Sequence, residues 1–178
     1  MNPLKIVFTG PVGSGKTSAV ETISEVPVVQ TEVVPTDTLK NNKSLTTTAM
    51  DYGELTIDTN QTLALYGTPG QTRFAYMWDI LSKDALGIIL LVSNKRRKPI
   101  DDLCFYINHF KYQIESSTAA FGVTHLDSFE NPQYEMEKYY AFFDKNRYSF
   151  PLFPVDTRQR YHVKVLIESL LSMLEIGD

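Results

Sequence analysis

Residues 10–17 read Gly-Pro-Val-Gly-Ser-Gly-Lys-Thr and satisfy the pattern Gly-x4-Gly-Lys-Ser/Thr at every defined position. The apolar run from Leu4 to Thr9 predicts a strand before this segment, and residues 16–23 predict a helix after it. Glycines between a strand and a helix let the chain turn back, so that successive N–H groups point inward and form an anion-binding nest. The segment therefore predicts a phosphate-binding loop, which limits the chain to folds that contain a strand–loop–helix unit.

The chemistry of such a loop assigns roles to its last two residues. Lys16 would neutralise the β- and γ-phosphates of a nucleotide, and the Thr17 hydroxyl would ligate Mg²⁺. A glycine-rich turn with an incidental lysine is the alternative, and the flanking strand and helix argue against it. The expected nucleotide contacts in this part of the chain are Gly10, Pro11, Val12, Gly13, Ser14, Gly15, Lys16, Thr17 and Ser18.

Strand and helix patterns alternate along the whole chain, which is typical of an α/β domain with a mostly parallel sheet. We expect a three-layer P-loop NTPase sandwich in a single domain over residues 1–178, with six strands and about five helices. A hairpin formed by residues 49–66 would make one edge strand antiparallel. The expected strands are residues 4–9, 49–57, 61–66, 86–92, 119–123 and 152–155, and residues 26–44 are expected to form a loop. The expected helices include residues 16–23, 72–82, 103–114, 136–143 and 163–174.

The composition excludes several classes of protein. Apolar residues make up 43% of the chain and the net charge is −4, as in ordinary globular proteins and unlike most nucleic-acid-binding proteins. Cys104 is the single cysteine, so no disulfide can form within the chain and a reducing compartment is expected. The longest apolar stretch is too short to span a bilayer, and no lipidation signal is found. We therefore expect a cytoplasmic protein without a covalent membrane anchor and without a nucleic-acid partner.

Four further polar segments lie next to predicted strands. One precedes the second long strand, and the other three each follow a strand, where ligands of α/β sheets bind. They are Thr46-Thr47-Thr48-Ala49-Met50-Asp51-Tyr52, Gly67-Thr68-Pro69-Gly70-Gln71, Thr124-His125-Leu126-Asp127 and Val155-Asp156-Thr157.

Together with the phosphate loop, these segments resemble the motifs of the Ras-like small GTPases over nearly the whole chain. The resemblance implies that Thr47 in the first switch ligates Mg²⁺, although Thr46 and Thr48 remain alternatives. It also implies that Gly70 offers its N–H to the γ-phosphate and that Gln71 orients the attacking water, so that Gln71 and Lys16 are the expected catalytic residues. The segments after the last two strands correspond to the base-binding motifs of the family. The residues expected to contact the base there are Thr124, His125, Asp127, Val155, Asp156 and Thr157.

Base selectivity would come from Asp127, which can accept hydrogen bonds from the guanine N1–H and exocyclic amine; adenine cannot supply this pair. The chain departs from the family at Gly67, where the family has an aspartate that holds a magnesium-bound water, and at His125, where it has lysine. Asp51 and Asp37 are candidate substitutes for the missing aspartate. Asp51 is about 13 Å from Thr47 in an extended strand, which makes it too distant without strand movement.

Within the family, a Pro-Gly-Gln segment without the aspartate is similar to the bacterial gliding-polarity GTPases and to GTP-binding proteins of bacterial signalling operons. This resemblance implies a roadblock-domain regulator or effector as partner. The expected function is a GTP/GDP switch with Mg²⁺ as cofactor and slow GTP hydrolysis. Two alternatives stay open: a binding module that holds nucleotide with hardly any hydrolysis, and a metabolic P-loop kinase or ATPase.

Overall fold

The computed structural model describes residues 4–31, 50–58 and 61–176. Within them one sheet runs in the spatial order β2-β3-β4-β1-β5-β6-β7. The strands are β1 (Leu4–Thr9), β2 (Val29–Thr31), β3 (Met50–Asp58), β4 (Gln61–Gly67), β5 (Gly87–Ser93), β6 (Ala119–Thr124) and β7 (Leu152–Pro154). The α-helices are α1 (Lys16–Ile23), α2 (Ala75–Ser82), α3 (Pro99–His109), α4 (Lys111–Ser116), α5 (Pro132–Asn146) and α6 (Arg160–Ile176).

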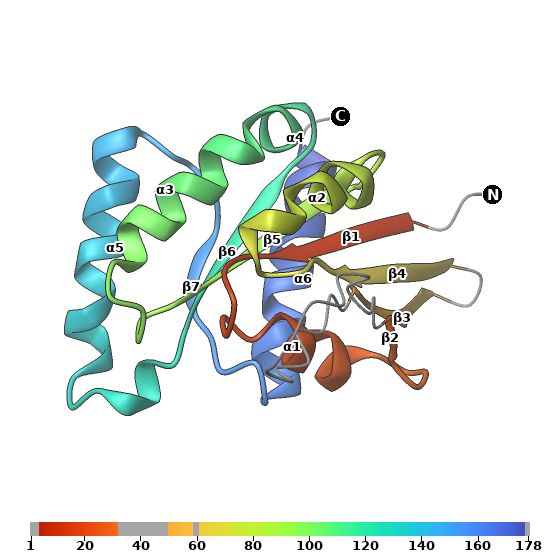
Figure 1. Cartoon of the computed structure of the whole chain (residues 1–178), viewed down its shortest axis with the longest axis horizontal. Helices are drawn as coiled ribbons and strands as arrows, with labels where there is room; N and C mark the ends of the chain where they lie inside the picture. The colour runs from red at the N-terminus through yellow and green to blue at the C-terminus, as the bar shows by residue number, and fades with distance from the viewer. Residues whose placement is uncertain (1–3, 32–49, 59–60, 177–178) are drawn as a thin grey trace, which may run out of the picture.

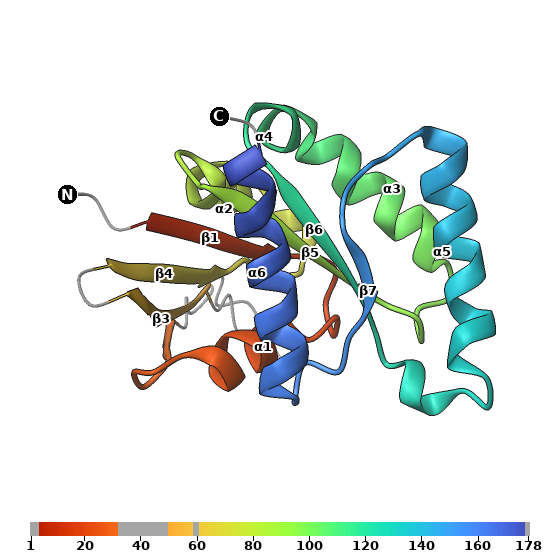
Figure 2. The same cartoon turned by 180° about the vertical axis from the view of Figure 1, so that it is seen from behind.

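The three-layer arrangement is confirmed by two buried clusters, one on each face of the sheet. Helices α1 and α6 cover one face, and α2, α3, α4 and α5 cover the other (Figures 1 and 2). Alternate residues of β5 supply the two clusters: Ile88 and Leu90 belong to the cluster under α3 and α5, and Ile89 to the cluster under α1 and α6. This explains why β5 is continuously apolar, since a central parallel strand is buried on both faces.

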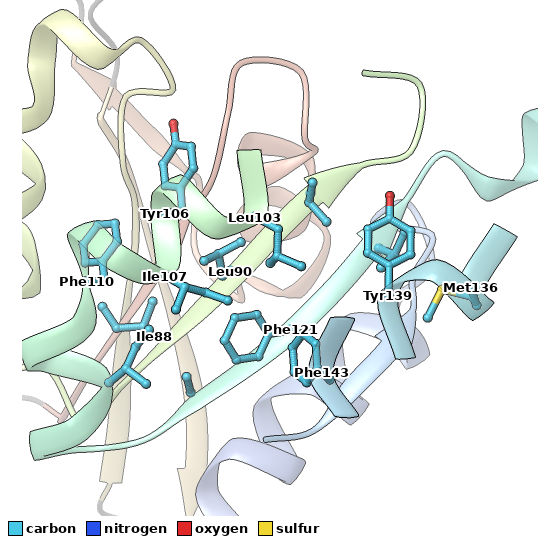
Figure 3. Close-up of a cluster of buried hydrophobic side chains, with 14 of the residues drawn as sticks. Ile88, Leu90, Leu103, Tyr106, Ile107, Phe110, Phe121, Met136, Tyr139 and Phe143 are labelled. Carbon is cyan, nitrogen blue, oxygen red and sulfur yellow. The ribbon is translucent and has the colours of Figure 1, made fainter. Parts of the chain in front are cut away.

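The larger cluster contains most of the buried aromatic side chains among the described residues (Figure 3). Phe121 of β6 lies between the sheet and α5, where its ring meets that of Phe143 at 5.0 Å between centroids. Trp78 of α2 packs against the Tyr106 ring of α3 at 4.9 Å. These contacts fix α2 and α3 on the sheet, and both helices flank the phosphate loop region.

Three details of the predicted fold are wrong. The sheet has seven strands instead of six, because the predicted loop over residues 26–44 contains β2, which at three residues is too short to show a sequence period. The reversed strand is β3, and it is not an edge strand, because β2 pairs with its outer side. The described residues hold six α-helices instead of five, because the helix expected over residues 103–114 breaks at Phe110.

The break at Phe110 has a packing explanation. Its backbone leaves helical geometry at φ −92°, ψ 15°, while its ring is fully buried in the larger cluster. The change of direction lets α4 bury Ile114 in the same cluster. In the part of the chain that the structure describes, no helix has the length and apolar character that crossing a bilayer requires.

Candidate functional site

The phosphate loop joins β1 to α1 at the centre of the sheet, as predicted. Its lysine, Lys16, is only 7% exposed, and its ammonium donates hydrogen bonds to the carbonyl oxygens of Gly10 and Pro11, both at 2.8 Å. Burial lowers the pKa of Lys16 to about 8, an effect that the nearby Asp51 carboxylate partly offsets. The loop therefore holds a buried cation that faces its own carbonyl groups, an arrangement that an anion would stabilise.

Two glycines of the loop are required by its shape. Gly10 has φ +138°, and a Cβ there would lie 2.0 Å from the Leu91 carbonyl oxygen of β5. Gly15 has φ +96°, and a Cβ there would lie 2.7 Å from the Thr157 hydroxyl. A side chain at either position would be strained by the backbone and would collide with a neighbouring strand or loop. Gly15 thus brings the phosphate loop against the segment that follows β7.

The segment after β4 closes on the phosphate loop from the other side. A Cβ on Gly70 would lie 2.6 Å from the backbone nitrogen of Val12 and 2.9 Å from Lys16 Nζ. Trp78 Nε1 donates to the Pro69 carbonyl at 2.6 Å, and the Tyr106 hydroxyl donates to the Gly70 carbonyl at 3.2 Å. The structure therefore places Gly70 beside the loop and anchors its segment to α2 and α3.

Gln71, the residue predicted to orient water, lines a pocket of about 590 Å³. This pocket separates the phosphate loop and the segment after β4 from α3. Arg73 also lines it, with its guanidinium 4.7 Å from the centre of the Phe74 ring. Arg96, which the sequence analysis did not single out, lines the same pocket and pairs with Asp102 at 2.8 Å. Two cationic side chains therefore lie near Gln71.

The predicted magnesium ligands are only partly described. Thr17 is the second residue of α1, and its hydroxyl donates to Asp51 Oδ2 at 2.6 Å. Thr47 and the alternatives on either side of it, as well as Asp37, lie outside the described residues. The sequence argument that placed Asp51 too far away measured its distance to Thr47. The structure shows that β3 brings Asp51 to Thr17 instead.

A second pocket, of about 650 Å³, lies beside the phosphate loop at the carboxyl ends of β6 and β7. It contains all six residues that the sequence predicted to bind the base and two of the predicted phosphate-loop contacts, together with five that were not predicted. The predicted residues that line it are Gly15, Ser18, Thr124, His125, Asp127, Val155, Asp156 and Thr157. The additional residues are Lys95, Leu126, Pro154, Arg158 and His162.

Thr124 links this base-side pocket to the phosphate loop. Its hydroxyl lies 3.0 Å from the Ser14 carbonyl and 2.9 Å from His125 Nδ1. A consistent arrangement has Thr124 donating to the loop and His125 donating to Thr124. His125 takes a left-handed conformation with φ +59°, and this turn starts the short 3-10 helix Leu126–Ser128. Asp127 lies on that helix.

The Asp127 carboxylate is half exposed and pairs with Arg158, whose Nη2 lies 2.9 Å from Oδ2. Arg158 is held in turn by Asp156 through Nε at 2.8 Å and Nη2 at 2.9 Å. Hydrogen bonds from Arg158 lower the pKa of Asp156, so this carboxylate stays ionised. Arg158 directly follows the predicted segment Val155–Thr157. Its position after the end of a strand is the sequence signal that could have identified it as part of the site.

The described residues contain no group of three or more histidine, cysteine or acidic side chains that could by itself hold a metal ion. The phosphate loop, Gly70 and the base-side pocket form one continuous arrangement, because Gly15, Ser14 and Lys16 contact the other segments directly.

Comparisons with known proteins bear on the fold and on the family of the chain. A search of curated proteins gave no match. The fold is similar to the crystal structure of a bacterial selenocysteine-specific elongation factor, EF-Sec, with a TM-score of 0.65 and 19% identity. That similarity covers 97% of this chain and 29% of the elongation factor, and at this identity it supports the fold alone.

The sequence also matches, over residues 8–149, the family described as "conserved hypothetical ATP binding protein". The matched region covers most of the chain and includes the phosphate loop, the segment after β4 and Asp127. The chain therefore belongs to the family of conserved hypothetical ATP binding proteins, and it is a nucleotide-binding protein with a P-loop NTPase fold.

Proposed function

We propose that this protein is a guanine-nucleotide switch that binds GTP and GDP and hydrolyses GTP slowly. The observation that carries the proposal is the position of Asp127, which lines the same pocket as Gly15 and Ser18. A nucleotide with its phosphates in the loop would place its base in this pocket. Asp127 would then accept hydrogen bonds from the guanine N1–H and exocyclic amine, each worth about 1.5–3 kcal/mol for a charged acceptor.

Arg158 takes part in this proposed recognition. Its guanidinium occupies Asp127 Oδ2 in the structure, so guanine must displace it or share the carboxylate with it. Because Asp156 also binds Arg158, the guanidinium stays paired with a carboxylate when it leaves Asp127. Replacing Arg158 by guanine at Asp127 should therefore cost little free energy, because Asp127 remains solvated or paired at each stage.

Lys16 and Gln71 are the proposed catalytic residues. Lys16 would turn from the Gly10 and Pro11 carbonyls to the β- and γ-phosphates, and Gln71 would orient the attacking water. The segment of residues 32–49 contains no arginine. Without a built-in arginine there, we expect an intrinsic rate below about 10⁻³ s⁻¹, in the range of Ras-like basal rates. Mg²⁺, when bound with the nucleotide, would supply charge neutralisation between the phosphates, with Thr17 and Thr47 as proposed ligands.

The proposed switch responds to the γ-phosphate through Gly70, where an added Cβ would collide with Val12 and Lys16. Tyr106 and Trp78 connect this segment to α3 and α2, so a shift at Gly70 would reach the outer helices. The resemblance to gliding-polarity GTPases supports a roadblock-domain protein as the partner that senses this change. A bound partner would act as regulator or effector, and the protein would work in the cytoplasm.

Adenine-nucleotide binding is the second candidate function, and the description of the family favours it. A third possibility, a binding module with hardly any hydrolysis, is favoured by Gly67, because β4 ends there without a carboxylate. Single-turnover hydrolysis of GTP and ATP, with and without a roadblock partner, separates these functions. The switch predicts slow GTP hydrolysis that a partner accelerates. Preferential ATP hydrolysis supports the second function, and no hydrolysis with intact GTP binding supports the third.

Asp127→Asn provides a direct test of base recognition. The amide can donate to the C2 carbonyl of xanthine, so this variant should prefer XDP to GDP. Asp144→Asn, on the exposed surface of α5, is the matched control and should leave the preference for GDP unchanged. If Asp127→Asn binds GDP as tightly as the unmodified protein does, Asp127 does not read the base.

A further inference from the structure

The carboxyl end of β4 lacks an acidic side chain at the position nearest the phosphate loop. In P-loop NTPases, Mg²⁺ is held by the loop Ser/Thr and by an aspartate at the end of a neighbouring strand. Here β4, the strand next to β1 on this side, ends at Gly67. The loop threonine, Thr17, is present. The usual second element is therefore missing from the strand where it would be expected.

Asp51 of β3 occupies the space that a side chain at position 67 would need. The two residues are direct partners in the antiparallel pairing of β3 with β4. A Cβ added to Gly67 would lie 2.7 Å from Asp51 Oδ2 and 3.1 Å from Asp51 Cβ. Side chains of such a pair lie on the same face of the sheet. The glycine at position 67 is therefore what allows the Asp51 carboxylate to cross over β4.

The Asp51 carboxylate points to the phosphate loop. Its Oδ2 accepts the hydrogen bond from the Thr17 hydroxyl, and its charged neighbours are Lys16, which is attractive, and Glu21, which is repulsive. A P-loop hydroxyl that ligates Mg²⁺ does so with its oxygen, so its neighbours are close to the ion and to the waters around it. Asp51 is thus adjacent to the group that would hold the metal.

The other carboxylate oxygen has no structural role within the described residues. Asp51 is 2% exposed, and its Oδ1 is buried without a hydrogen-bond partner among them. A buried carboxylate oxygen left without a partner is costly, and such groups call for an explanation such as an ion or ordered water. Asparagine would hold Thr17 equally well through its carbonyl oxygen. Holding Thr17 therefore does not explain the charge.

We propose that Asp51 is the positioning carboxylate for nucleotide-bound Mg²⁺, transferred from the end of β4 to β3 and accommodated there by Gly67. The residues fit the ion because Asp51 offers an unpartnered anionic oxygen beside the Thr17 hydroxyl. The inference rests on nucleotide binding at the proposed site, but it does not depend on which base is bound. It also accounts for how the chain would hold Mg²⁺ without an acidic residue at position 67.

The test measures release of a fluorescent nucleotide at controlled concentrations of free Mg²⁺, using GDP or ADP derivatives according to which one binds. In the unmodified protein Mg²⁺ should slow release. Asp51→Asn keeps an acceptor for Thr17 and removes the charge. It should raise the Mg²⁺ concentration that gives half-maximal slowing by about 10- to 100-fold, as expected for partners of metal ligands. Release in excess EDTA should stay within about twofold of the unmodified rate.

Asp58→Asn is the matched control, because it makes the same change at the exposed far end of β3. It should leave the Mg²⁺ dependence unchanged. The double variant Asp51→Gly/Gly67→Asp returns the carboxylate to β4 and should recover most of the Mg²⁺ dependence. Gly67→Asp alone should not strengthen it, because a side chain there collides with Asp51.

The outcomes separate this inference from the proposed function. An unchanged Mg²⁺ dependence in Asp51→Asn overturns the role of Asp51 even if GDP binds tightly and selectively. Preference for ADP over GDP overturns the guanine proposal and leaves the Asp51 test intact. Failure to bind any nucleotide overturns both. Thermal unfolding in EDTA should show Asp51→Asn at least as stable as the unmodified protein, since the buried Oδ1 of the carboxylate has no hydrogen-bond partner among the described residues.

Discussion

Lys16 should make the stability of the nucleotide-free protein depend on pH in a specific way. Its pKa is about 8 in the folded chain and 10.5 ordinarily, so between these values the unfolded chain binds more protons than the folded one. Stability must then rise with pH through this interval. One pKa unit corresponds to about 1.4 kcal/mol, and the free energy of unfolding should increase by about 2 kcal/mol between pH 7 and pH 9.5 from this residue alone.

Lys16→Met isolates the effect, because it removes the charge and keeps much of the side-chain volume. At pH 7 it relieves the cost of the buried ammonium but loses two hydrogen bonds to Gly10 and Pro11, worth about 0.5–1.5 kcal/mol each. The net change at pH 7 is therefore small. The informative quantity is the unfolding free energy of the unmodified protein minus that of Lys16→Met. This difference should be about 2 kcal/mol larger at pH 9.5 than at pH 7.

The assay is urea unfolding of nucleotide-free protein in EDTA at pH 7, 8, 9 and 9.5. Lys164→Met, an exposed lysine on α6, is the control and should follow the unmodified protein at every pH. Saturating nucleotide should abolish the pH dependence in the unmodified protein, because phosphate next to Lys16 favours its charged form. A difference between Lys16→Met and the unmodified protein that stays constant within about 0.5 kcal/mol across this range would refute the reasoning.

Three further changes test other parts of the site. Gly15→Ala should destabilise the protein by about 1–3 kcal/mol and weaken nucleotide binding, because it combines backbone strain with a collision. Gly13→Ala is the comparison, because a Cβ there would have no neighbour within 4 Å and only the strain remains. Urea unfolding and nucleotide titration measure both variants. Arg158→Ala should accelerate GDP association in stopped-flow experiments, since Asp127 no longer has to be released, while the urea unfolding curve stays close to that of the unmodified protein because the ion pair is exposed. Gln71→Ala should lower partner-stimulated single-turnover GTP hydrolysis by about 100-fold and leave the GTP dissociation constant within about threefold.

Local sequence patterns predicted the central part of the fold well. The strand over residues 4–9 and the helix over residues 16–23 agree with β1 and α1 at both ends, because the glycine loop fixes the boundary between them. The buried strand β5 and the amphipathic helix α6 were also predicted, since long apolar periods identify them. What local patterns did not reveal is β2, whose three residues are stabilised by pairing with β3, far along the chain.

In the candidate site too, features set by local sequence could be predicted, and features set by contacts between distant segments could not. The phosphate loop and Asp127 could be predicted, because their chemistry lies in short contiguous motifs. The pairing of Asp51 with Gly67 could not, because it depends on the register between β3 and β4. The interaction of Arg158 with Asp127 also depends on two loops that meet only in the folded chain. The substitution at Gly67 was visible from the sequence, and Asp51 was named as a candidate substitute, but its contact with Thr17 was not predicted.

The central claim, that this pocket selects guanine, is tested most directly by competition for the purified protein. Nucleotide-free protein is loaded with fluorescent GDP in the presence of Mg²⁺, and the label is displaced with unlabelled GDP, GTP, ADP and ATP. The account predicts that the guanine nucleotides displace it at concentrations at least about 100-fold lower than the adenine nucleotides, since two charge-assisted hydrogen bonds to Asp127 are at stake. Equal displacement by ADP and GDP, or a preference for ADP, would contradict it.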